Sequence, residues 1–115
     1  MSQIQDIDAE QLDSIVKQGD PVLLLIWIKS CDQCRRFKPI FNQLPEYYPR
    51  VKFLRMNMFE SMENLRLAER YEKETTPIIP VFCRGEHLGT FIGYYSLEDF
   101  RAKLDEILSE NNCLC

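Results

Sequence analysis

The chain has 115 residues, 45% of them hydrophobic, which suits one globular domain with a single apolar core. A formal net charge of −4 argues against a nucleic-acid binder, and an odd count of five cysteines argues against a secreted disulfide scaffold. The apolar run at residues 22–28 is far shorter than the ~20 residues of a membrane span, and no basic and apolar leader precedes Asp6. We therefore expect a cytoplasmic protein without a membrane span.

Strands and helices alternate along the predicted chain, which indicates an α/β fold. Strands are expected at residues 3–7, 22–28, 51–58, 78–83 and 88–92. Helices are expected between Asp8 and Gly19 and at residues 32–44, 61–72 and 97–108, the last one capped by Ser96. The run at 22–28 is apolar throughout, which is typical of a strand buried on both faces. We expect one domain over residues 1–108 and a polar tail over residues 109–115.

Cys31 and Cys34 follow the predicted strand at 22–28 and stand at the start of the next predicted helix. A cysteine at a helix N-terminus faces unpaired backbone N–H groups and the positive end of the helix dipole, and both favour the thiolate. The thiolate is the nucleophile in disulfide exchange, so we expect Cys31 to attack a substrate disulfide. Cys34 lies one turn along the same side of the helix and is expected to resolve the mixed disulfide.

Several short features stand at fixed distances from this pair. They are Trp27 four residues before Cys31, Pro39 five residues after Cys34, the dipeptide Thr76-Pro77, the segment Phe82-Cys83-Arg84-Gly85-Glu86 and, just before the last helix, Gly93. With these features the chain resembles the thioredoxin family over roughly residues 3–108. The resemblance implies the thioredoxin fold, a central mixed β-sheet of about five strands flanked by four helices.

The resemblance also implies a thiol–disulfide oxidoreductase that exchanges the Cys31–Cys34 pair with protein disulfides and needs no bound cofactor. In the family the proline at the position of Pro77 has a cis peptide bond, and the backbone before it pairs with an extended substrate segment. By resemblance the substrate groove consists of Trp27, Thr76, Pro77 and Gly93. The implied partners are protein disulfides and a thioredoxin-reductase-like or dithiol electron donor, and we expect a monomer.

Two departures from the family pattern concern the dithiol. The usual Trp-Cys-Gly-Pro-Cys motif is replaced at residues 30–34 by Ser-Cys-Asp-Gln-Cys. The family's buried aspartate, six residues before the first cysteine, helps to take the proton from the resolving cysteine, and here Leu25 stands in its place. Arg55 aligns with the lysine that partners this aspartate. We therefore expect weakened activity, with slower resolution by Cys34 at neutral pH and a steeper rise of rate with pH.

The other cysteines allow several interpretations. Cys113 and Cys115 end the chain as Cys-Leu-Cys, which fits an accessory redox pair that exchanges with the dithiol, a site of lipid or metal attachment, or no role. A zinc site would need these two cysteines together with Cys31 and Cys34, and we expect no metal, because a single residue separates them and Pro77 faces the first pair. Cys83 falls within a predicted strand and is expected to be a core thiol.

A function from another class stands beside the oxidoreductase. The chain could be a thioredoxin-fold protein-binding module or redox-sensing adaptor with little turnover, and Leu25 and the Asp32-Gln33 dipeptide favour this alternative. A basic cluster next to the dithiol suits a solvated helix face or, if it binds a partner, an acidic one. Its members are Lys29, Arg35, Arg36 and Lys38.

Overall fold

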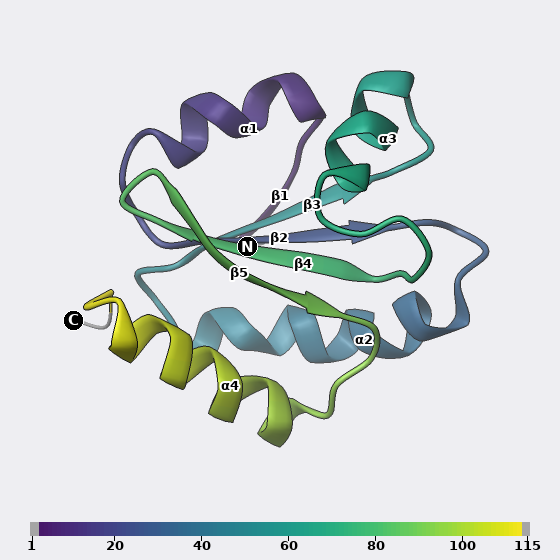
Figure 1. The fold of residues 1–115 in the computed structure, drawn as a ribbon. Helices are drawn as coiled ribbons and strands as arrows, with labels where there is room; N and C mark the ends of the chain where they lie inside the picture. The colour runs from purple at the N-terminus through teal and green to yellow at the C-terminus, as the bar shows by residue number, and fades with distance from the viewer. Residues whose placement is uncertain (1–2, 114–115) are drawn as a thin grey trace.

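Five strands form one mixed sheet in the computed structural model, which describes residues 3–113 (Figure 1). The strands are β1 (Ile4–Asp6), β2 (Val22–Trp27), β3 (Lys52–Asn57), β4 (Ile78–Cys83) and β5 (Glu86–Ile92). Their order across the sheet is β1-β3-β2-β4-β5. β3 runs parallel to both β1 and β2, whereas β4 runs antiparallel to β2 and β5 antiparallel to β4. The predicted five-stranded mixed sheet is confirmed, with β2 at its centre.

Within residues 3–113 four α-helices cover the sheet, α1 and α3 on one face and α2 and α4 on the other (Figure 1). They are α1 (Ala9–Val16), α2 (Asp32–Gln43), α3 (Met62–Glu69) and α4 (Leu97–Glu110). Serines cap two of them where the sequence predicts helix starts. Ser61 Oγ accepts the Asn64 N–H, and Ser96 Oγ accepts the Asp99 N–H, each at 3.1 Å.

β2 supplies side chains to both halves of the core, because successive residues of a strand point to opposite faces. Leu23 and Leu25 join the buried cluster between the sheet and the α2 and α4 pair. Leu24 and Ile26 join the cluster between the sheet and the α1 and α3 pair. Residues 22–26 are at most 2% exposed, which explains why the run has no polar position.

The end of α4 differs from the sequence expectation of a polar tail after residue 108. The helix runs to Glu110, and Asn112 then adopts a left-handed φ of 57°. The Asn112 N–H donates to the Ser109 carbonyl at 3.1 Å. The Cys113 N–H donates to the Leu108 carbonyl at 2.7 Å, and the two bonds together form a Schellman motif. This turn directs the chain back toward the sheet.

Cys113 forms a disulfide with Cys83, the last residue of β4, across a Cα–Cα distance of 6.6 Å. Cys83 is 4% exposed and Cys113 is 9% exposed. Cys83 lies in the core as expected, but as half of a disulfide and not as a thiol, and Cys113 is not free to act as half of an accessory redox pair. The pairing depends on the turn after α4, which brings the two residues together. Cys115, the other expected member of that pair, lies outside the described residues.

We expect loss of the Cys83–Cys113 bond to destabilise the fold, because a cross-link over 30 residues restricts the unfolded chain. Cys113→Ser should lower the free energy of unfolding by ~3–4 kcal/mol under non-reducing conditions. Urea unfolding followed by Trp27 fluorescence measures the change. Cys115→Ser is the matched control and should unfold at the wild-type midpoint. A Cys113→Ser variant with the wild-type midpoint would contradict a stabilising disulfide.

Candidate functional site

The two cysteines of the dithiol lie at the start of α2. Cys31 is the N-cap, with an extended backbone at φ −96° and ψ 116°. Its Sγ accepts the Cys34 N–H at 3.0 Å, so the sulfur satisfies one of the free donors of the first turn. Both cysteines are free thiols, Cys31 partly exposed and Cys34 buried. An accessible sulfur at the helix end, with a buried sulfur one turn behind it, suits an attacking and a resolving thiol.

Three of the four expected groove residues gather beside Cys31 on the β4 side of the dithiol. The Thr76–Pro77 peptide bond is cis, as the resemblance implies. The Cys31 thiol donates to the Thr76 carbonyl at 3.5 Å from sulfur to oxygen. The Gly93 N–H donates to the Pro77 carbonyl at 2.8 Å. The attacking sulfur therefore faces the segment to which the resemblance assigns substrate binding.

Trp27, the fourth expected groove residue, lies toward the other flank. It ends β2, and its carbonyl accepts the Met58 N–H at 2.9 Å. Its side chain lines two hollows that it shares with Asp6 and Arg55 of β1 and β3. Since β3 and β4 border opposite edges of β2, the structure places Trp27 at the β3 flank of the dithiol rather than beside Gly93.

Gln33 makes a contact across the site for which the sequence carries no signal. Its Oε1 accepts the Tyr94 N–H at 2.9 Å and lies 3.1 Å from where a Cβ on Gly93 would stand. Gly93 has a left-handed φ of 86°, so its backbone and this close approach both favour glycine. Arg36 adds a cation–π contact, 4.8 Å from the centre of the Tyr94 ring. α2 therefore holds the segment after β5 directly beside the dithiol.

Cys34 is strongly protected from ionisation. Burial first, and then the hydrogen bond with Cys31, raise the pKa of Cys34 to about 11. Leu25 lines the same hollow as Cys34 and is 2% exposed. The aspartate that the family carries at this position would be a nearby proton acceptor, and a leucine side chain cannot replace it.

Arg55 has a carboxylate partner that the sequence analysis missed. Leu25, Arg55 and Asp6 stand in register across the neighbouring strands β2, β3 and β1. Arg55 Nε and Nη2 donate to the two carboxylate oxygens of Asp6 at 2.9 and 3.1 Å. The carboxylate at this level of the sheet therefore lies on the edge strand instead of the central strand. The Asp6 side chain is 71% exposed on the edge strand, whereas an aspartate at the Leu25 position of β2 would be buried.

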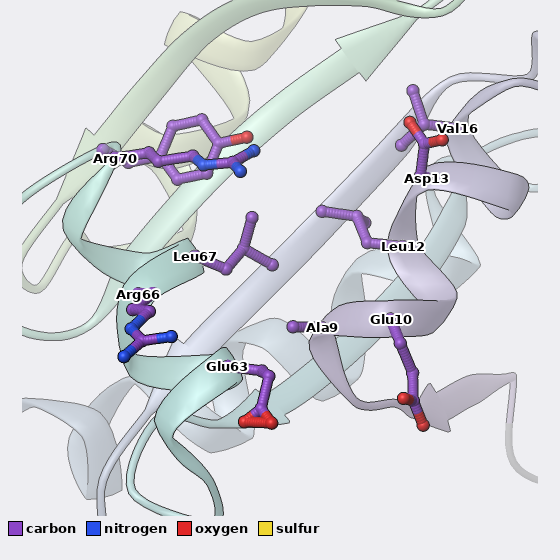
Figure 2. Close-up of a pocket in the computed structure, with 10 residues that line it drawn as sticks. Ala9, Glu10, Leu12, Asp13, Val16, Glu63, Arg66, Leu67 and Arg70 are labelled. Atoms are coloured by element: carbon purple, nitrogen blue, oxygen red, sulfur yellow. The ribbon is translucent and has the colours of Figure 1, made fainter.

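One of the two hollows lined by Trp27 reaches the dithiol, and a separate hollow on the other face of the sheet does not. One of about 330 Å³ includes Cys34 in its lining and lies between α2 and the strands β1 to β3. A larger one of about 500 Å³ lies between α1 and α3, where Leu12 and Leu67 point toward one another (Figure 2). The lining of this larger hollow contains no cysteine, whereas the first hollow reaches Cys34.

The described part of the chain offers little beyond the dithiol for metal binding or for a membrane span. There, no group of three or more His, Cys, Asp or Glu side chains is placed to hold a metal ion. His87 is exposed, lies 2.7 Å from Thr90 Oγ1 and packs against Tyr71. None of the helices in residues 3–113 is long and apolar enough to span a bilayer.

Sequence comparisons find relatives along nearly the whole chain. The family model described as thioredoxin matches residues 3–106. Chloroplastic thioredoxin M2 of Arabidopsis thaliana is 30% identical over 107 residues, which cover 91% of this chain and 56% of that protein. A thioredoxin of Pyropia yezoensis is 26% identical over 110 residues, which cover 95% of this chain and 100% of that protein. The chain spans about half the length of the chloroplastic relatives from Arabidopsis thaliana and Brassica napus.

Solved structures share the fold. Thioredoxin f from spinach chloroplast superposes with a TM-score of 0.77 at 24% identity, covering 94% of this chain and 93% of that one. Mitochondrial thioredoxin 3 from Saccharomyces cerevisiae, in its oxidised form, gives a TM-score of 0.77 at 19% identity, covering 92% and 99%. The arrangement of sheet and helices is therefore common to these proteins and this chain.

We expect the reactivity of Cys34 to rise about tenfold per pH unit between pH 7 and pH 9. Its pKa of about 11 leaves the thiol mostly protonated in this range, so each added pH unit multiplies the small thiolate fraction. The measurement is the rate of iodoacetamide alkylation in a Cys31→Ser/Cys115→Ser variant, where Cys34 is the remaining free thiol and its burial persists.

The same variant unfolded in urea is the control for Cys34 alkylation. There the rate should level off above the ordinary thiol pKa of ~8.5. A rate that already levels off below pH 9 in the folded protein would show that burial does not protect Cys34.

Proposed function

The chain belongs to the thioredoxin family, and from that premise we propose that it is a thiol–disulfide oxidoreductase that acts on protein disulfides. The proposal rests on one observation above the others. Cys31 lies at the N-cap of α2, partly exposed, with its sulfur against the carbonyl that precedes the cis bond to Pro77. A nucleophilic sulfur and a backbone that can pair with an extended peptide thus stand side by side.

The reaction transfers two electrons from the dithiol to the substrate. The Cys31 thiolate attacks one sulfur of a substrate disulfide, forms a mixed disulfide and releases the other substrate sulfur as a thiolate that takes up a proton. Cys34 then loses its proton to solvent and attacks the Cys31 sulfur. The second substrate sulfur leaves as a thiol, and the Cys31–Cys34 pair is left oxidised. A reductase or another dithiol must return two electrons to it.

Deprotonation of Cys34 is the demanding step in this sequence. Its burial raises the pKa to about 11, and Leu25 offers no acceptor for the proton. The Asp6 carboxylate is engaged by Arg55 at the sheet edge. These features support weakened turnover at neutral pH compared with a family member that keeps the buried aspartate.

The groove for the substrate backbone is formed by Thr76, Pro77 and Gly93. The Gly93 N–H is already engaged by the Pro77 carbonyl, which fixes the spacing between the two segments. Gln33 borders this groove at Gly93, where its Oε1 accepts the Tyr94 N–H. An extended substrate segment would therefore lie between Thr76 and Gln33, with its disulfide over Cys31.

The proposed partners are proteins with accessible disulfides and, as electron donor, a thioredoxin-reductase-like enzyme or another dithiol. We propose that the protein works as a monomer in the cytoplasm. The Cys83–Cys113 bond sets a condition on this compartment, because a disulfide persists there only if its reduction potential is lower than that of the glutathione pool. Burial of both cysteines, which limits attack by small thiols, supports such persistence.

A protein-binding module or redox-sensing adaptor with little turnover is the alternative function. The raised pKa of Cys34 and the apolar Leu25 beside it favour this alternative, because both slow the resolving step. In that case the groove at Pro77 holds a partner, and the dithiol reports the redox state. Turnover at neutral pH separates the two functions, because an adaptor has little of it. An adaptor also keeps its partner binding when Cys31 is removed.

Insulin reduction with dithiothreitol as the electron source tests the oxidoreductase. We expect Cys31→Ser to fall to the dithiothreitol background, because it lacks the attacking sulfur. Reduced Cys34→Ser, mixed with insulin after the dithiothreitol has been removed, should accumulate a mixed disulfide with the substrate, visible by mass spectrometry, because the resolving thiol is absent. Cys115→Ser is the control and should match wild type. Insulin reduction by Cys31→Ser at the wild-type rate would refute the proposed function.

Equilibration in glutathione buffers, followed by trapping of free thiols, should reveal two separate couples. A cytoplasmic reductant requires a Cys31–Cys34 potential near ~−270 mV and a Cys83–Cys113 potential below about −300 mV. Cys113→Ser removes the second couple and should leave the first unchanged. If Cys83–Cys113 is reduced at the glutathione potential of the cytoplasm, the result argues against that compartment. A Cys31–Cys34 potential well above about −200 mV would indicate an oxidant or a sensor.

A further inference from the structure

The hollow beside Cys34 has an apolar floor and a positively charged rim, and we call it the basic hollow. Leu25, Trp27 and Ile28 line its floor, and its volume is about 330 Å³. The cationic side chains in its lining are Lys29, Arg35, Lys38 and Arg55. The hollow therefore combines a surface that accepts the stem of a side chain with charges that attract an anion.

Two of these cations are free to bind a ligand. Arg55 is engaged by Asp6, the one carboxylate in the lining, and Arg35 lies 3.2 Å from an oxygen of Asp32. Lys29 and Lys38 are exposed, and neither takes part in the ion pairs found within residues 3–113. The excess positive charge of the basic hollow is therefore located on these two lysines, at its solvent side.

This excess contrasts with the chain as a whole, whose formal net charge is −4. The larger hollow between α1 and α3 has both acidic side chains and two arginines, Arg66 and Arg70, in its lining (Figure 2). Its acidic residues are Glu10, Asp13 and Glu63. Charges in that hollow roughly cancel, whereas those beside Cys34 do not, so the basic hollow is electrostatically complementary to a negatively charged group.

We propose that the basic hollow binds an acidic side chain of the protein whose disulfide Cys31 attacks. This inference rests on the proposed function and names its substrate class, protein disulfides with Asp or Glu close to a cysteine. The groove at Thr76 and Gly93 lies on the β4 flank of the dithiol, and the basic hollow lies on the β3 flank. A segment that is bound in the groove and extends across Cys31 would therefore point its neighbouring residues toward the flank on which Lys29 and Lys38 lie.

Two peptides, each with one disulfide, test this preference. They are identical except that one carries Glu and the other Gln on both sides of the cysteines. Wild type should favour the Glu peptide in kcat/KM by about three- to tenfold at low salt, mainly through KM, since exposed ion pairs are individually weak. The preference should shrink at 1 M salt, where screening is strong.

Charge reversal at the rim provides the matched comparison. Lys38→Glu should abolish or invert the ratio of the two kcat/KM values. Lys103→Glu changes the net charge equally on an exposed position of α4 that is not in the lining of the basic hollow, and it should keep the wild-type ratio. Lys38→Gln should fall between wild type and Lys38→Glu, which separates the loss of a cation from the addition of an anion.

Failure of the inference can be told apart from failure of the proposed function. The proposed binding of acidic side chains by the basic hollow would be refuted by Cys31-dependent turnover of both peptides at equal kcat/KM, or by an unchanged preference in Lys38→Glu. Either result would leave the proposed oxidoreductase function intact. If neither peptide is reduced, the proposed oxidoreductase function is refuted. Calorimetric titration with a cysteine-free Glu peptide then tests separately whether the basic hollow binds acidic side chains. Weaker binding to Lys38→Glu than to Lys103→Glu supports it, and equal or absent binding overturns it.

Discussion

β2 pairs along both edges and is buried on both faces, and the geometry of the site follows from this position. A strand held in this way cannot shift its register without exposing apolar side chains, so the point at which it ends is fixed. Cys31 therefore stands at the edge of the sheet as the N-cap of α2. β4 runs antiparallel to β2, so Thr76 and Pro77, just before β4, arrive at this same edge.

The carboxylate near the dithiol lies on β1 as Asp6 and not on β2 at the position of Leu25, and this placement changes how Cys34 can lose its proton. A buried aspartate on β2 would lie beside Cys34, and its charge would have to be balanced in the interior. In this chain the central position is apolar, and the ion pair of Asp6 and Arg55 lies at the partly solvated edge. The interior is therefore spared an ionisable group, while Cys34 depends on solvent for proton transfer. The space beside Cys34 remains as a hollow with an apolar floor.

Local patterns were enough to predict the dithiol at a strand–helix junction, because an apolar run and a Cys-x-x-Cys pair are readable over a dozen residues. Contacts that depend on the relative placement of distant segments were missed. The Cys83–Cys113 bond depends on the left-handed turn at Asn112, and the bond from Gln33 to Tyr94 depends on the path of the chain after β5. The pairing of Asp6 depends on the register of a three-residue edge strand, which its sequence is too short to specify.

The two sulfur pairs lie at opposite ends of β4, because Thr76 precedes its first residue and Cys83 is its last. At a rise of about 3.3 Å per residue, this strand separates them by on the order of 17 Å. Thiol–disulfide exchange requires direct contact between sulfur atoms, so the dithiol and Cys83–Cys113 cannot exchange directly where they lie in the fold of residues 3–113. Transfer between them needs an encounter of two molecules or a small thiol as a shuttle. The rate of the encounter route would depend on protein concentration, so in the absence of a small thiol dilution would isolate the two couples from each other.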